Sequence, residues 1–223
     1  MRIQKNKGFS LMEVLIAVVI IAIGILGFLG LQALGTVSSQ SGELRGQANA
    51  VAENLISSMR ANRDYINCDE SDPDNNANCS TANSSNIYST NSDYICRATD
   101  GSALNTPAKL CTTNSCTPSE LAEFDAWSVC MQMMPTTTAQ DNMLPDGEIF
   151  VACTDKDSTD TDTCSVGSKH SVYVFWAGRM ERTGSGQNTT NIASQCTTYW
   201  TATLGRDASE LERRDCTFME FIP

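Results

Sequence analysis

A long run without charge constrains the fold of this chain more than any other feature. From Val14 to Gly42 no residue has a charged side chain. Its most apolar part, Val14–Leu31, would extend about 27 Å as an α-helix at about 1.5 Å per residue. That length approaches the roughly 30 Å of a bilayer's hydrocarbon core. The run can therefore cross a membrane as one helix, and Glu13 places a carboxylate at its start.

Two common explanations leave part of this N-terminal segment unexplained. A cleaved secretory signal has an apolar region of about 7–15 residues and a small-residue cleavage site after it, whereas the run here is longer. A plain membrane anchor accounts for the basic residues Arg2, Lys5 and Lys7 through the positive-inside rule. It does not account for Glu13, because an acid inside a membrane-spanning segment is costly and usually has a partner.

A third explanation comes from the residues around the start of the run. The segment Gly8-Phe9-Ser10-Leu11-Met12-Glu13 follows a basic leader and resembles the Gly-Phe-(Thr/Ser)-Leu-(Ile/Met)-Glu signature of type IV pilins and related pseudopilins. The resemblance implies that residues 1–8 form a leader peptide, which a prepilin peptidase removes by cutting between Gly8 and Phe9. It also implies that the amine of Phe9 is methylated, and that Glu13 forms a charge pair with the N-terminal amine of a neighbouring subunit.

The properties of a membrane interior support this pairing of Glu13. An ammonium group and a carboxylate are each costly alone in a medium of low dielectric constant, and they are tolerated together. The alternative is that Glu13, which lies near the start of the helix, extends its carboxylate to the membrane interface.

The helix should continue beyond the membrane. Apolar residues recur at spacings of three, four or seven with polar residues between them, which is typical of an amphipathic helix with one apolar stripe. The stripe comprises Leu34, Val37, Leu44, Ala48, Val51, Leu55 and Met59. We therefore expect one helix over residues 9–61, with residues 9–34 in the membrane or the filament core. Residues 62–223 should form a globular extracytoplasmic head.

The ten cysteines predict a disulfide framework in that head. All of them lie at or after position 68, on one side of the predicted membrane helix. They are Cys68, Cys79, Cys96, Cys111, Cys116, Cys130, Cys153, Cys164, Cys196 and Cys216. An even number of cysteines outside the membrane is typical of an oxidising compartment. The full pairing is left open by the sequence, which suggests only the local pairs Cys111–Cys116 and Cys153–Cys164.

The charge and the histidine content exclude several functions. The net charge of −11 argues against nucleic acid as a partner, because phosphate binding needs basic patches. His170 is the only histidine, so neither a mixed Cys and His zinc site nor a Ser-His-Asp or Cys-His catalytic site is expected. We therefore predict no enzyme activity and no cofactor.

One acidic cluster is a candidate calcium site. Four aspartates lie close together between Cys153 and Cys164, and carboxylate oxygens are ligands that Ca²⁺ prefers. They are Asp155, Asp157, Asp160 and Asp162. The spacing of an EF-hand is absent, and the favoured alternative is a solvated acidic loop closed by a Cys153–Cys164 bridge.

The rest of the head predicts an α+β fold. Residues 62–117 are rich in Asn, Ser, Asp and Thr, so we expect loops held by disulfides there, with short strands near residues 87–88 and 94–95. Thr117-Pro118-Ser119-Glu120 predicts the capped start of a helix. The apolar stripe expected on that helix is Leu121, Phe124, Trp127, Met131 and Met134. Strands are expected over residues 148–153, 171–177, 198–201 and 216–222.

A second resemblance concerns the head and the end of the long helix. The turn Leu144–Gly147, the pattern Val172-x-Val174-x-Trp176 and the helix end Met59–Asn62 resemble minor pilins of the PilV type, which modify or help to assemble type IV pili. The resemblance implies a type IV pilin fold, in which the long helix packs on an antiparallel sheet. It also implies a subunit near the pilus tip that primes assembly with other minor pilins and the major pilin, with a tip adhesin as a further candidate partner.

Two alternatives remain open. The first is a pseudopilin of a type II secretion system, because pseudopilins have the same kind of N-terminal segment. The second is a membrane-anchored extracytoplasmic binding module that never polymerises. That module would keep its leader and would tolerate Glu13→Ala.

The mass of the protein isolated from its native membrane tests the predicted processing. We expect the mature chain to begin at methylated Phe9 with all ten cysteines oxidised, because the leader ends at Gly8 and the head lies outside the cytoplasm. Intact-protein and N-terminal peptide mass spectrometry measures both properties. An intact Met1 with Arg2, Lys5 and Lys7 still attached would contradict the pilin interpretation and leave a simple signal anchor.

Overall fold

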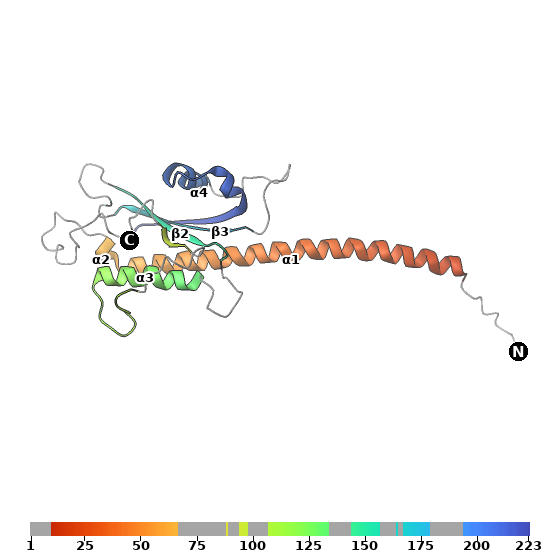
Figure 1. Ribbon diagram of the computed structural model, residues 1–223, viewed down its shortest axis with the longest axis horizontal. Coiled ribbons are helices and arrows are strands. Elements are labelled where there is room, and N and C mark those ends of the chain that lie inside the picture. The colour runs from red at the N-terminus through yellow and green to blue at the C-terminus, as the bar shows by residue number, and fades with distance from the viewer. Residues whose placement is uncertain are drawn as a thin grey trace. The chain divides into compact units, whose positions relative to one another are not determined.

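A computed structural model describes residues 10–66, 88, 94–97, 107–133, 144–156, 164, 167–178 and 194–223. The contacts within the chain define two compact units, residues 1–42 and 43–223. The second unit contains every described strand and every described helix after the first (Figure 1).

The predicted long helix is confirmed as α1, which runs from Leu11 to Ala61. Its apolar stripe is buried from Leu44 onward, whereas Leu34 is exposed. The buried face consists of Leu44, Ala48, Val51, Ala52, Leu55, Ile56 and Met59. Asn62 follows the last residue of the helix, and its side-chain amide donates to the carbonyl of Pro118 at 2.8 Å. A short helix, α2 (Arg63–Ile66), follows directly.

Among the described residues, four strands form one antiparallel sheet in the order β1-β2-β3-β4. They are β1 (Tyr94–Arg97), β2 (Glu148–Thr154), β3 (Lys169–Ala177) and β4 (Arg214–Phe221). The strands expected at 94–95, 148–153, 171–177 and 216–222 are therefore confirmed. Tyr88 lies in a turn, so it does not extend a strand. The predicted turn before β2 is also present, and its Asp146 has a positive φ of 50°.

The sheet is buried on both faces because it separates two apolar cores. Side chains alternate across a strand, so Val172 and Val174 face the core formed with α1 and α3 (Pro118–Met133). Tyr173 and Phe175 face the second core, formed with α4 (Ser194–Thr198) and the segments after it. Figure 1 shows this order of layers, with α1 and α3 on one side of the sheet and α4 on the other.

The helix start predicted at Thr117 is confirmed by a reciprocal capping box. The backbone N–H of Thr117 donates to Glu120 Oε2 at 2.8 Å, and the backbone N–H of Glu120 donates to Thr117 Oγ1 at 3.3 Å. Such a box satisfies two N–H groups that the first helical turn would otherwise leave unpaired.

The apolar stripe predicted on α3 is wrong. Its members are only partly covered, and Met131 is 45% exposed; Met134 lies outside the described residues. The buried face is Ala122, Asp125, Ala126, Val129, Cys130 and Met133. At about 100° per residue, the two stripes lie on nearly opposite faces of the helix. Ala122 and Ala126 allow α3 to approach the core closely, and Phe124 and Trp127 pack on each other beside it.

The strand expected at residues 198–201 is also wrong. The segment is helical: α4 leads into a π-helical turn, η3 (Tyr199–Thr203), which Gly205 follows with a positive φ of 63°. In a strand Tyr199 and Trp200 would point to opposite faces. Here both enter the second core, together with Cys196 one turn earlier.

A buried carboxylate connects the start of β2 to the C-terminal part of the head. Glu148 is fully buried, and its Oε2 lies 2.6 Å from a guanidinium nitrogen of Arg206. Arg214 approaches Oε1 of the same carboxylate at 3.7 Å. Both guanidinium groups lie over the ring of Trp200, with Cζ at 4.6 Å and 5.3 Å from the ring centroid. This cluster, the Glu148 clamp, joins β2, η3 and the start of β4.

Replacing Glu148 with Gln should lower the free energy of unfolding, because two partly buried arginines would lose their counter-charge. Breaking a buried ion pair costs about 3–5 kcal/mol. We expect roughly 2–4 kcal/mol here, since Arg206 and Arg214 retain some contact with water. Urea unfolding of the full chain in detergent micelles, followed by tryptophan fluorescence, measures the change. Glu212→Gln is the control, because Glu212 is exposed, and equal stability of the two variants would contradict the prediction.

Candidate functional site

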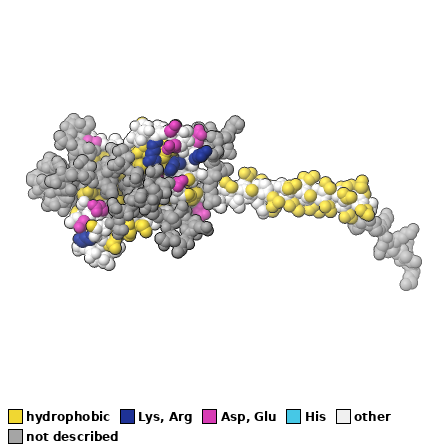
Figure 2. Space-filling model, in the orientation of Figure 1, with side chains coloured by type: hydrophobic (Ala, Val, Ile, Leu, Met, Phe, Trp, Pro, Cys, Tyr) yellow, Lys and Arg dark blue, Asp and Glu magenta, His cyan; other side chains and the backbone are white. Residues whose placement is uncertain are grey.

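The N-terminal half of α1 presents a continuous apolar surface. Every side chain from residue 11 to residue 36 is exposed, including Leu11 at 83% and Leu31 at 70%. Figure 2 shows apolar side chains covering this part of the helix. The helix is long and apolar enough to cross a membrane. So large an exposed apolar surface in a folded protein marks a contact with a membrane or with other proteins.

Glu13 lies in the first turn of this helix. Its backbone N–H and that of Val14 donate to the carbonyl of Ser10, at 3.0 Å and 3.3 Å. A carboxylate is stabilised at this end of a helix by the helix dipole. Residues 10–42 contain no basic side chain that could pair with it. Gly8 and Phe9 lie outside the described residues, so cleavage, methylation and the charge pair of Glu13 stay predictions.

The acidic cluster after β2 is described only at its first member. Asp155 Oδ1 accepts a hydrogen bond from Ser168 Oγ at 3.1 Å, and the same hydroxyl accepts from the backbone N–H of Lys156 at 2.9 Å. These contacts connect the end of β2 to the start of β3. Asp157, Asp160 and Asp162 lie outside the described residues, and the calcium hypothesis stays a prediction.

The structure contains both local disulfides that the sequence suggested. Cys111–Cys116 precedes α3, and Cys153–Cys164 closes the connection after β2. A third bridge, Cys196–Cys216, joins α4 to β4. Cys130 is also disulfide-bonded, and Cys68 and Cys79 lie outside the described residues.

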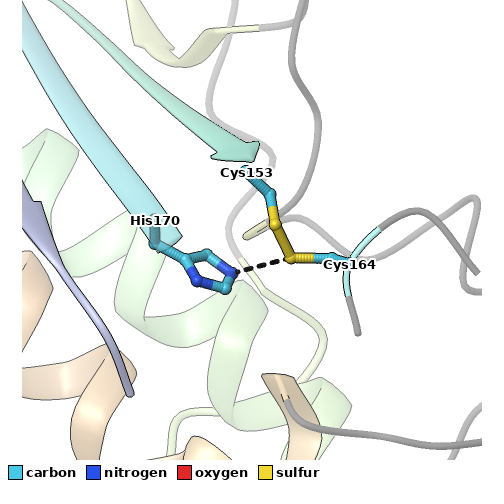
Figure 3. A group of neighbouring side chains, drawn as sticks. All are labelled: Cys153, Cys164 and His170. Atoms are coloured by element: carbon cyan, nitrogen blue, oxygen red, sulfur yellow. Dashed lines mark hydrogen bonds between the residues drawn. A yellow bond between two sulfur atoms is a disulfide. The ribbon is translucent and has the colours of Figure 1, made fainter. Parts of the chain in front are cut away.

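The single histidine lies against one of these bridges. His170 is the cross-strand partner of Cys153, and its Nε2 is 3.3 Å from Cys164 Sγ. Figure 3 shows the imidazole pointing at the bridge from the start of β3. The three side chains have metal-ligating atoms within 4.8 Å of one another. While the bridge is closed, however, its sulfurs are not thiolates, which are the form that binds metals.

The surroundings of His170 favour its neutral form. The side chain is 1% exposed, and its ring packs against Phe221 with the ring centroids 5.7 Å apart. Burial lowers the pKa of His170 from 6.5 to about 4, opposed in part by a backbone contact with Ser168. A disulfide sulfur carries no hydrogen, so the contact with Cys164 is a hydrogen bond in the tautomer that has its proton on Nε2, with Sγ as a weak acceptor.

A second buried polar group lies between α1 and α3. Tyr88 Oη donates to Asp125 Oδ2 at 2.8 Å. Burial raises the pKa of the Asp125 carboxyl, while hydrogen bonds from Tyr88 and Ser58 oppose this shift. The contact joins Tyr88 to α3.

Sequence reasoning missed the placement of His170 beside Cys153. One signal was available in the sequence. In two consecutive antiparallel strands without a bulge, the residue numbers of every cross-strand pair add up to the same value. Pairing Glu148 with Phe175 in that way also pairs Cys153 with His170, as the structure has it. No such local signal exists for the Glu148 clamp, because Glu148 is 58 residues from Arg206 in the sequence.

Stability should fall between pH 6.5 and pH 4 because of His170. In that window the unfolded chain binds a proton that the folded chain does not, since burial lowers the folded pKa from 6.5 to about 4. The free energy of unfolding should therefore decrease by about 2–3 kcal/mol more in the natural chain than in His170→Gln. Urea unfolding at pH 7, 6, 5 and 4 gives the free energy of unfolding of each protein as a function of pH. The contribution of the carboxylates is common to both proteins and cancels in the difference between the two slopes. Parallel slopes would contradict the prediction.

The comparisons with known proteins concern the N-terminus. A family model described as the prokaryotic N-terminal methylation motif matches residues 3–29. Comparisons with curated proteins and with solved structures gave no match. The matched residues include most of the leader with Lys5 and Lys7, then Gly8, Phe9 and Glu13, and the first part of the charge-free run. It supports a type IV pilin-like protein that is processed by a prepilin peptidase, anchored by its apolar helix and assembled with other pilins.

Proposed function

We propose that this chain is a minor pilin, which enters the type IV pilus and helps to prime its assembly. The observation that carries the proposal is the methylation motif at residues 3–29, joined directly to a helix half that is apolar and exposed. An unassembled subunit keeps this surface in the inner membrane. In the filament, the same surface packs on the helices of neighbouring subunits.

The head acts in this proposal through protein contacts. It has two apolar cores and at least three disulfides among its described residues, which suit a rigid module in the periplasm and on the pilus. Its partners are other minor pilins and the major pilin, with a tip adhesin as a further candidate, and its position is near the tip. The proposal includes no catalytic activity and requires no cofactor.

Two other functions share the same N-terminal motif. A pseudopilin of a type II secretion system would use the apolar helix in the same way, and a non-polymerising anchored module would use it only for attachment. The long cysteine-rich head favours the minor pilin over the pseudopilin, because we expect the equivalent pseudopilin to be smaller.

Cells that lack this chain distinguish a minor pilin from a pseudopilin. For a minor pilin we expect fewer surface pili by electron microscopy and unchanged protein secretion. Unchanged pili with reduced secretion would assign the chain to a secretion system.

Replacing Glu13 should block incorporation without blocking cleavage. Glu13→Gln keeps the shape of the side chain and removes its charge, so the amine of a neighbouring subunit would be left unpaired. Because breaking a buried ion pair costs about 3–5 kcal/mol, we expect at least a tenfold loss of the chain from sheared filaments, which corresponds to about 1.4 kcal/mol. Quantitative immunoblots of the filament and membrane fractions measure this loss.

Glu43→Gln is the matched control, since Glu43 is the first acid after the apolar run and is exposed. Normal incorporation of Glu13→Gln with a cleaved leader would refute the charge pair. A natural chain that is never found in filaments and keeps its leader would refute the pilin function itself.

A further inference from the structure

The Cys153–Cys164 bridge differs from the other described bridges in having an imidazole against it. The chain contains one histidine, so this contact cannot be repeated at Cys111–Cys116 or Cys196–Cys216. The distance from His170 Nε2 to Cys164 Sγ is 3.3 Å, and Figure 3 shows the ring directed at that sulfur.

The fold holds this contact in place. His170 pairs with Cys153 across β2 and β3, so both side chains lie on the same face of the sheet. Phe221 packs against the other side of the imidazole. The ring therefore has little freedom to turn away from the bridge when the bridge opens.

We propose that Cys153–Cys164 is a reactive disulfide that exchanges with dithiols, and that His170 stabilises its reduced form. This inference goes beyond the proposed function and does not depend on it. The partner is defined by its chemistry, as a small dithiol or a protein with a reactive pair of cysteines. His170 acts here as a positioning residue for the sulfur of Cys164.

The reaction is a two-electron exchange. A thiolate of the dithiol attacks Cys153 Sγ, the bond between the two sulfurs breaks, and its electron pair goes to Cys164 Sγ. The second sulfur of the dithiol then attacks the mixed disulfide, releases Cys153 and closes a new disulfide in the partner. One proton of the dithiol ends on Cys153 and the other is released to solvent, so Cys164 is left as the thiolate that faces His170. The partner is oxidised and the bridge is reduced.

The contribution of His170 follows from the acceptor strength of sulfur. A disulfide sulfur accepts a hydrogen bond weakly, whereas an N–H donor to a thiolate makes a charge-assisted bond of roughly twice the strength. The same N–H group therefore stabilises the reduced form and the leaving thiolate more than the closed bridge, which raises the reduction potential.

Cys196–Cys216 is the matched internal control. Its sulfurs belong to residues that are 0% and 4% exposed, comparable with 9% for Cys153 and 7% for Cys164. The two bridges are thus similarly shielded from solvent, and they differ in the imidazole. A comparison within one molecule also cancels any global loss of stability in a variant.

The experiment equilibrates the full chain in detergent micelles at pH 7 with mixtures of reduced and oxidised dithiothreitol, in the presence of a metal chelator. Acid quenching, alkylation and peptide mass spectrometry then give the reduced fraction of each bridge. We expect Cys153–Cys164 to be half reduced at a dithiol-to-disulfide ratio at least tenfold lower than Cys196–Cys216, which corresponds to about 30 mV.

Variants of His170 separate its chemistry from its packing. His170→Phe and His170→Leu fill the site without a donor and should remove the difference between the two bridges, whereas His170→Gln keeps an N–H donor and should retain part of it. Equal ratios for the two bridges in the natural chain would overturn the proposal. The proposal would also be overturned if His170→Phe or His170→Leu folds and still shows the difference between the two bridges.

Discussion

The buried face of α1 is the contact on which the rest of the head depends. One row of side chains, from Leu44 to Met59, contributes to the core that also contains α3 and one face of the sheet. The same helix has no buried side chain over residues 11–36. A single regular element therefore meets two environments, and an α-helix can do so because all its backbone hydrogen bonds are internal.

The second face of the sheet is stabilised by different means. Aromatic side chains fill it, with the rings of Tyr173 and Tyr199 stacked 3.9 Å apart. The Glu148 clamp and the Cys196–Cys216 bridge then connect this layer to β2 and β4. Burial, one ion cluster and one covalent bond thus converge on a short helical segment. This convergence explains why Thr198–Thr201, rich in β-branched and aromatic residues, is not a strand.

Much of this fold could be predicted from the sequence, because its main signals are local. The charge-free run, the capping box at Thr117 and the alternating strands each depend on residues a few positions apart. The buried face of α3 could not be predicted in that way, because Ala122 and Ala126 become buried only when α3 packs in the core that α1 also forms. At the candidate site, the motif from Gly8 to Glu13 could be recognised from consecutive residues of the sequence. The contact of His170 with Cys164, in contrast, depends on the register of β2 and β3.

The order of the disulfides along the chain has a consequence for how the head matures. Three described bridges join cysteines that are consecutive in the sequence: Cys111–Cys116, Cys153–Cys164 and Cys196–Cys216. An oxidase that pairs the ten cysteines strictly in the order in which they emerge from a translocation channel would make Cys153–Cys164 and Cys196–Cys216 correctly, but it would join Cys116 to Cys130 instead of to Cys111. Cys130 is bonded too, yet both of its neighbours in sequence, Cys116 and Cys153, are already taken. Its bridge requires a more distant partner, so it is the described cysteine most exposed to mispairing during export and most dependent on an isomerase.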